Sequence, residues 1–174
     1  MLVKPKGGEA LVHYMKPVAG TLAGLPKPSD DPALVVHGYG KGKAIYFSGD
    51  LGNVLNSFHL LEWSRLIENS LQDLAPSPVL VEDAPRSLEV VLRSQEQGRR
   101  LVLHLVNFTG EMTRPIRDIV PLHDVRITLA AEKKVKRVSS LMHPQTLRTR
   151  RDDEGRVQFV LPRVDEYEVV VIER

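Results

Sequence analysis

Asp50 is the acidic side chain whose position in the sequence best suits chemistry. It lies in the segment GDLG at 49–52, between an expected strand and an expected helix. α/β proteins often hold functional groups at such a junction. A carboxylate at the same position can instead accept backbone N–H bonds in the first turn of the helix. No nucleophile partner accompanies Asp50, so helix capping is favoured over a residual hydrolase site.

The histidines are the residues that could serve as metal ligands or as proton carriers. They are His13, His37, His59, His104, His123 and His143. None forms a ligand pair with the spacing of known metal motifs. His37 and His59 flank the GDLG segment and could approach Asp50, but a hydrogen-bonded or surface role is favoured for each histidine taken alone. The sequence therefore predicts no catalytic residue, no cofactor site and no metal site.

The glycine-rich segment at 38–42 could be mistaken for a phosphate-binding loop. Phosphate-binding glycines open a helix, whereas Gly40-Lys41-Gly42 leads into an apolar run typical of a strand. A hairpin turn is favoured, because glycine adopts the positive φ that such turns need.

Charge gives little reason to expect a nucleic-acid partner. The chain has 24 basic and 22 acidic residues, a net charge of +2. Its basic cluster comprises Lys133, Lys134, Lys136 and Arg137, with Arg148, Arg150 and Arg151 on a neighbouring strand. The cluster could bind an anion or an acidic protein surface. Because it lacks the aromatics that stack on bases, protection of a sheet edge is favoured over nucleic-acid binding.

Other features bear on hydrolysis, carbohydrate and membranes. The acidic runs at 30–31 and 152–154 are interpreted as charged turns rather than as catalytic pairs. Aromatic residues make up 5% of the chain, and the single tryptophan, Trp63, lies on an expected helix, so carbohydrate binding has weak support.

No apolar run reaches the roughly 20 residues that span a bilayer. The N-terminal residues do not resemble a signal peptide. These features predict a cytoplasmic protein with no membrane partner.

The prolines at 76 and 78 mark the expected boundary between two domains. Before them, Leu60, Trp63, Ile67, Leu71 and Leu74 form an apolar stripe with helical spacing, and Asn56 or Ser57 is the expected N-cap. Three strands are expected upstream, at Ala10–Tyr14, Leu34–His37 and Lys43–Ser48, with a loop at Pro17–Pro32 between the first two.

Beyond the prolines the apolar residues alternate with period two, which is typical of strands. About seven short strands separated by turn residues predict an antiparallel β-sandwich, with Leu103 and Phe159 in its core. The expected fold class is α+β: a short α/β segment with one main helix over residues 1–75, followed by an antiparallel β-sandwich domain over residues 79–174.

Several segments resemble the C-terminal part of certain glycoside hydrolases. Pro32–Leu51 is similar to the end of their amidotransferase-like domain, called the β-galactosidase trimerisation domain. Arg99–Gly110, Pro121–Val125 and Tyr167–Val171 resemble the β domain that follows it. The likeness extends from about Gly8 to Glu173.

The resemblance implies an accessory role without catalysis. In these families the catalytic carboxylates lie on an N-terminal barrel that this sequence lacks. Amidotransferases of this fold class use a cysteine nucleophile, and the chain has no cysteine. We therefore expect a non-enzymatic accessory or oligomerisation domain; the alternatives are a carbohydrate-binding module and a residual hydrolase site around Asp50. The first domain has too few elements to cover its apolar surface, so the expected partner is a second copy of the chain or a missing catalytic domain. Carbohydrate is a further candidate.

Overall fold

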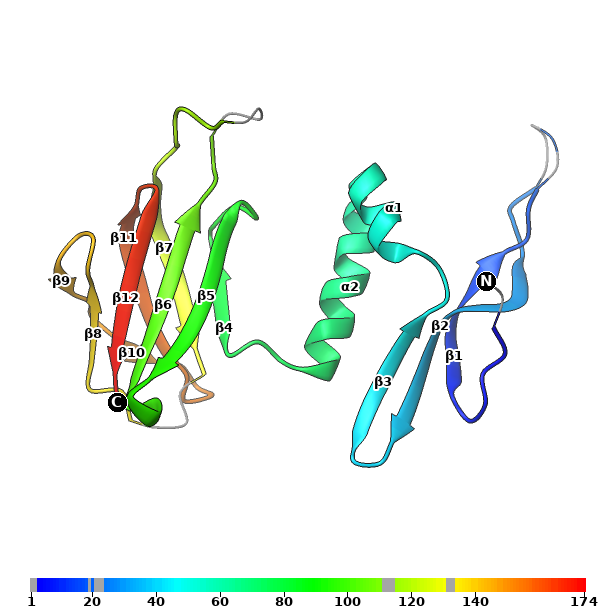
Figure 1. Cartoon of the computed structure of the whole chain (residues 1–174), viewed down its shortest axis with the longest axis horizontal. Helices are drawn as coiled ribbons and strands as arrows, with labels where there is room; N and C mark the ends of the chain where they lie inside the picture. Colours follow the sequence, from blue (N-terminus) through cyan, green and yellow to red (C-terminus); the bar gives the residue numbers. More distant parts are fainter. Residues whose placement is uncertain (1–2, 19, 21–23, 111–114, 131–133) are drawn as a thin grey trace. The chain divides into compact units, whose positions relative to one another are not determined.

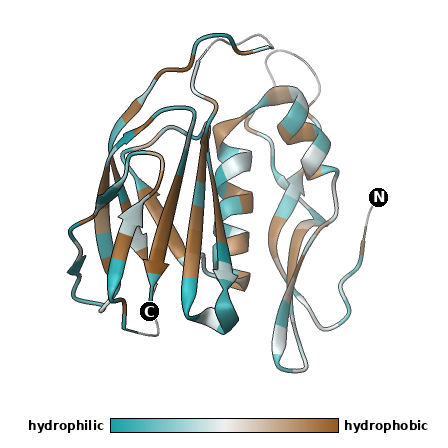
Figure 2. Cartoon of the chain, turned by 60° about the vertical axis from the view of Figure 1, so that its left-hand side comes forward, coloured by the Kyte–Doolittle hydropathy of each residue, from teal (hydrophilic) through white to brown (hydrophobic). Residues whose placement is uncertain are grey.

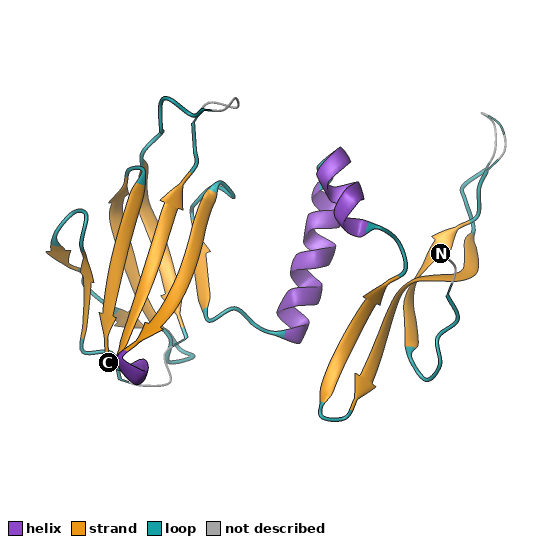
Figure 3. Ribbon diagram, in the orientation of Figure 1, coloured by secondary structure: helices purple, strands orange, loops and turns teal. Residues whose placement is uncertain are grey.

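Two compact units make up the chain, Met1–Pro76 (unit 1) and Ser77–Arg174 (unit 2). The computed structural model describes residues 3–18, 20, 24–110, 115–130 and 134–174. Strands dominate this part of the chain, and the paired strands run antiparallel (Figure 3). Neither helix that it contains has the length and apolar character needed to cross a membrane.

Unit 1 contains a three-stranded sheet and two helices (Figure 1). The elements are β1 (Glu9–Met15), β2 (Pro28–Tyr39), β3 (Gly42–Phe47), α1 (Leu51–Phe58) and α2 (Leu61–Leu74). Strand β2 lies between β1 and β3. Tyr39 pairs with Gly42 across a tight turn in which Gly40 has a φ of 58°. The prediction of a hairpin turn at these glycines is therefore confirmed.

The prediction of one main helix is wrong, because a second helix precedes it. Asn56 and Ser57, the expected N-cap residues, lie inside α1. Helix α1 ends at His59, which adopts the left-handed conformation with a φ of 49°. Helix α2 then begins after Leu60, whose side chain makes no capping hydrogen bond. The left-handed residue reverses the chain and separates the two helices.

The predicted loop at Pro17–Pro32 is also partly wrong, because β2 begins at Pro28. Strand β3 pairs only with Leu34–Tyr39, so residues 28–33 of β2 have a strand partner on one side alone, where Met15 pairs with Pro28 and His13 with Pro32. Proline has no N–H to give to a ladder, and the open side of such a segment tolerates it.

Unit 2 consists of two antiparallel sheets. The four-stranded sheet has the order β10-β11-β7-β4, and the five-stranded sheet has the order β5-β6-β12-β8-β9. The strands are β4 (Val79–Glu82), β5 (Leu88–Gln95), β6 (Arg100–Asn107), β7 (Leu122–Leu129), β8 (Arg137–Ser140), β9 (Gln145–Thr146), β10 (Arg150–Arg151), β11 (Val157–Val164) and β12 (Tyr167–Glu173). A 3₁₀ turn, Glu96–Gly98, joins β5 to β6.

The core of unit 2 is formed by both sheets. Leu103 and Leu105 of the five-stranded sheet belong to the same buried cluster as Ile127, Phe159 and Leu161 of the four-stranded sheet. Leu103 is 1% exposed and Phe159 is 2% exposed, so their predicted burial is confirmed. The alternation of inward apolar and outward polar positions along these strands is what produces this shared core (Figure 2).

Candidate functional site

Asp50 caps helix α1. Its Oδ1 accepts a hydrogen bond from the backbone N–H of Asn53 at 3.1 Å. His37 instead donates from Nδ1 to the Gly7 carbonyl at 2.8 Å, and His59 ends α1 by donating its backbone N–H to Leu55. No hydrogen bond between described residues joins either histidine to Asp50, nor do the described parts of the chain bring together three His, Asp or Glu residues able to hold a metal ion.

The cavity beside Asp50 is small and apolar. Its volume is about 110 Å³, and its walls include Phe47, Val54 and Trp63. Ligand pockets for small molecules usually measure about 300–1,000 Å³. Tyr14, at its edge, uses its hydroxyl to accept a hydrogen bond from the Ser48 hydroxyl at 3.1 Å. The geometry around Asp50 thus supports helix capping and local packing rather than hydrolysis.

A buried carboxylate in unit 2 has the most hydrogen-bond donors around it. Glu168, on β12, is 0% exposed and pairs in register with Leu105 of β6. Its carboxylate accepts hydrogen bonds from the Ser140 hydroxyl at 2.7 Å and from the backbone N–H groups of Val169 at 2.8 Å, Met142 at 3.0 Å, Leu141 at 3.2 Å and His143 at 3.3 Å. These bonds tie the turn after β8 to β12.

His143 bridges this carboxylate to a second one. Its Nδ1 lies 3.1 Å from Glu168 Oε2, and its Nε2 lies 3.1 Å from Asp165 Oδ2. Asp165 also accepts a hydrogen bond from Arg163 Nε at 2.7 Å. A neutral imidazole carries one N–H and can donate to only one of the two carboxylates, whereas the protonated ring donates to both. The array therefore consists of two carboxylates joined through one imidazole ring.

The carboxyl groups of this array favour their charged forms. Burial acts to raise the pKa of Glu168, but the hydrogen bonds from Ser140, Met142, His143 and Val169 outweigh it and leave that pKa below its ordinary value. At Asp165, the Arg163 hydrogen bond lowers the pKa against the opposing effect of desolvation. Both groups consequently act as acceptors rather than as proton donors near neutral pH.

A cavity of about 510 Å³ lies next to the array. His143 and Asp165 line it together with Arg117, Asp118 and Tyr167, whereas Glu168 does not. Hydrolysis of a glycoside needs two carboxyl groups facing each other across the bond, roughly 5 to 10 Å apart. Because Glu168 is enclosed by its donors, it stabilises the turn at 141–143 instead of meeting a substrate.

The sequence reasoning did not find this array. The feature of the sequence that could indicate the array is the alternation along the last strand, which places Glu168 on the same inward face as Val170 and Ile172. A carboxylate at an inward position must have partners, because an unpaired buried charge is costly. Those partners lie in the turn 25 to 28 residues earlier, so sequence spacing alone does not reveal them.

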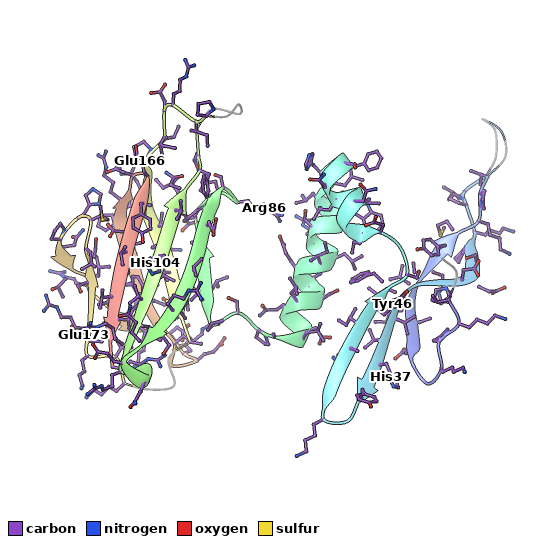
Figure 4. All side chains as sticks on the ribbon, viewed as in Figure 1. His37, Tyr46, Arg86, His104, Glu166 and Glu173 are labelled. Carbon is purple, nitrogen blue, oxygen red and sulfur yellow. The ribbon has the colours of Figure 1, made fainter. Side chains whose placement is uncertain are left out.

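The other predicted polar residues lie apart from this array. Arg150 and Arg151 form β10, at the edge of the four-stranded sheet, and Arg137 begins β8. Lys133 lies outside the described residues. The positions of Arg150 and Arg151 agree with protection of a sheet edge, whereas β8 lies between β12 and β9. His104 lies on β6 (Figure 4). Its Nδ1 lies 2.5 Å from the hydroxyl of Tyr167 on the neighbouring strand β12.

The acidic runs differ from each other. Asp152 accepts hydrogen bonds from Glu154 and Arg156, as expected of a charged turn, and the Arg156 hydrogen bond lowers its pKa. The interpretation of residues 30–31 as a turn is wrong, because both belong to β2. The proline at 32 suggested a break there, but the open side of this part of β2 accommodates it.

Comparison with known proteins gives a fold likeness. No protein-family model and no curated protein sequence matches the chain. The structure is similar to that of the α-L-fucosidase isoenzyme 2 from Paenibacillus thiaminolyticus, with a TM-score of 0.72 and 20% identity. The likeness covers 95% of this chain and 27% of the fucosidase. A cycloisomaltooligosaccharide glucanotransferase from Paenibacillus sp. has a TM-score of 0.43 and 16% identity, over 54% of this chain and 16% of that one.

Proposed function

We propose that this chain is a non-catalytic accessory region of a glycoside-hydrolase-like protein. The fold likeness to the fucosidase carries the proposal, because it spans both units of this chain but only 27% of that enzyme. Under this proposal, unit 1 is the end of an amidotransferase-like domain and unit 2 is the β domain that follows it. The segments at Pro32–Leu51 and Arg99–Gly110, which resemble those domains, support the assignment.

The chemistry of the polar residues favours the accessory role. Asp50 is engaged at the start of α1, and Glu168 is enclosed by hydrogen-bond donors. The chain has no cysteine that could act as the nucleophile of an amidotransferase. These contacts disfavour Asp50 and Glu168 as members of a carboxyl pair for glycoside hydrolysis.

Unit 1 also provides a surface suited to oligomerisation. We define its apolar surface as the exposed side chains on β1, β3, the two helices and Leu60 between the helices: Leu11, Val12, Tyr14, Met15, Tyr46, Phe58, Leu60, Leu61, Trp63, Leu71 and Leu74. Apolar groups in such number favour contact with another protein over contact with water. A second copy of the chain is the proposed partner, because each copy presents the same surface and two copies can cover it symmetrically.

Sedimentation velocity at micromolar concentration tests this function together with an activity assay. We expect a species heavier than the 19.5 kDa monomer and no turnover of aryl glycosides, the α-L-fucoside included. The triple variant Leu11→Ser, Phe58→Ser and Leu71→Ser should shift the species toward the monomer. Leu141→Ser, at an exposed apolar residue of unit 2, is the matched control and should leave association unchanged.

Two results would overturn the proposal. A wild-type monomer that binds no apolar dye removes the oligomerisation role. Turnover that is lost in Asp50→Ala establishes a hydrolase site instead, and the accessory role then fails.

A further inference from the structure

A cavity in unit 2 lies among arginines and has no role in the function proposed above. Its volume is about 600 Å³, within the range of small-molecule sites. Arg126 of β7, Arg148 of the loop before β10 and Arg150 of β10 line it. Three guanidinium groups at one cavity suit an anionic ligand, because each can donate two parallel hydrogen bonds to a carboxylate.

Strand register places Arg126 and Arg150 on one face of the four-stranded sheet. Arg150 pairs with Gln158, and Arg126 pairs with Val160 on the opposite side of the same strand, β11. Residues 158 and 160 lie on one face because side chains alternate along a strand. Two strand spacings and one two-residue step separate the Cα atoms of the two arginines by about 12 Å. Their long side chains can converge on one ligand across that span.

The existing contacts leave these arginines available. Arg126 Nη1 contacts Asp83 Oδ2 at 3.1 Å, but both side chains are largely exposed, and such surface pairs are weak. Among the described residues, Arg150 donates from Nε to Gln158 Oε1 at 2.8 Å and its terminal nitrogens make no hydrogen bond. Arg148 is exposed and makes no ion pair or side-chain hydrogen bond with a described residue. A carboxylate would therefore compete with two partners, the exposed Asp83 carboxylate and the Gln158 amide oxygen.

The remaining lining residues suit a sugar. Gln145 and Thr149 can donate to and accept from hydroxyl groups, while Val160 and Pro162 offer an apolar wall for the C–H face of a ring. We propose that this cavity binds a saccharide carrying a carboxylate, namely a hexuronate unit. The choice of a saccharide rests on the proposed function, whereas the preference for a carboxylate rests on the arginines alone.

Titration calorimetry of the full chain with a galacturonate disaccharide tests the site. We expect saturable binding that weakens at least tenfold for the same disaccharide with its carboxylates reduced to alcohols. The double variant Arg148→Gln and Arg150→Gln should lose at least tenfold in affinity. Arg93→Gln, at an exposed arginine of β5 outside the cavity, is the control and should bind like the wild type. Thermal unfolding checks that all variants remain folded.

The outcomes separate this site from the accessory role. Absence of binding at millimolar ligand, equal binding of the reduced disaccharide, or equal loss in Arg93→Gln overturns the site. Tighter binding of a glutamate-rich peptide than of the disaccharide replaces the saccharide by an acidic protein surface. Each result can occur whether or not the chain associates or turns over glycosides, so failure of the site and failure of the accessory role are distinguishable.

Discussion

The two units differ mainly in how much apolar surface each one buries by itself. In the described part of unit 2, fourteen buried side chains form one cluster that includes residues of both sheets. In unit 1, the described hydrophobic side chains that are buried are Leu34 and Val35. Phe58 is 67% exposed and Leu71 is 59% exposed. Unit 2 therefore buries an apolar core of its own, whereas unit 1 leaves many of its described large apolar side chains exposed.

The amino-acid composition of the two units does not explain the difference in buried apolar surface. The way in which sheets and helices pack in layers within each unit does. Unit 2 places an apolar face of one sheet against an apolar face of another. Unit 1 has one sheet and two helices, and α2 makes little contact with that sheet. One of these contacts is the ion pair between Lys43 and Asp73, at 2.8 Å. The apolar stripe of a helix stabilises a protein only when another layer covers it.

Truncation of Phe159 should give the largest effect. Phe159→Ala removes a 2% exposed ring from the shared core of unit 2 and should lower its free energy of unfolding by about 3–5 kcal/mol. Leu71→Ala in unit 1 should cost less than about 1 kcal/mol, because that side chain is already exposed. Urea unfolding followed by circular dichroism measures both values.

Trp63 makes the comparison sharper, because the single tryptophan of the chain lies in unit 1. Its fluorescence should report a transition at lower urea than the circular dichroism of the strands. In Phe159→Ala the fluorescence transition should keep its midpoint while the dichroism transition moves. Coincident transitions that move together would contradict the independence of the two units.

Removal of the charge of Glu168 should give the next largest effect. Glu168→Gln replaces an acceptor of several hydrogen bonds by an amide whose NH₂ group faces other donors, and should cost about 2–4 kcal/mol. Glu89→Gln, at an exposed position of β5, is the matched control and should stay within about 0.5 kcal/mol of the wild type. The free energy of unfolding from urea titrations at pH 7 decides between these values. Equal stability of the two variants would mean that the array contributes nothing.

The same carboxylate should make stability depend on pH. The pKa of Glu168 is lower in the folded chain than its ordinary value of 4.5, so the unfolded chain binds the proton more readily. The contribution of the charged Glu168 to the free energy of unfolding is present above pH 4.5 and is lost as the pH falls through the lower pKa of the folded chain. His143 and Asp165, which face it, remain in both proteins. The difference in melting temperature between wild type and Glu168→Gln should therefore shrink between pH 6 and pH 3, and a constant difference would contradict this linkage.

Local patterns predicted much of unit 2 from the sequence. The apolar run at Leu101–Val106 predicts a central strand, and the alternation of Val157, Phe159 and Leu161 predicts a strand with one face toward the core. Helix α1 escaped prediction because it has eight residues and contains Gly52 and two asparagines, which have low helix propensity. Its cap at Asp50 was recognised as an alternative to catalysis, since an acid after a strand suits either role.

The site residues could be predicted less well than the strands. The array around Glu168 joins β12 to the turn after β8, so its hydrogen bonds depend on which strands become neighbours. The arginine cavity depends in the same way on the pairing of β10, β11 and β7. The sequence identified Arg148 and Arg150 as members of a basic cluster, but Arg126 comes from a strand more than twenty residues earlier. Only the register of the folded sheet brings it to the same cavity.

Substitution of Thr128 should change the free energy of unfolding least, and it should raise that free energy rather than lower it. It lies on β7, is 2% exposed, and its hydroxyl has no hydrogen-bond partner among the described residues. Burial of an unpaired hydroxyl costs free energy that a methyl group of similar size does not. Thr128→Val should therefore raise the free energy of unfolding of unit 2 by up to about 1 kcal/mol in urea titrations. Thr146→Val, which removes an exposed hydroxyl that accepts a hydrogen bond from Arg137, is the control and should give no gain. A loss of stability in Thr128→Val would mean that the hydroxyl has a partner in solution, such as a bound water.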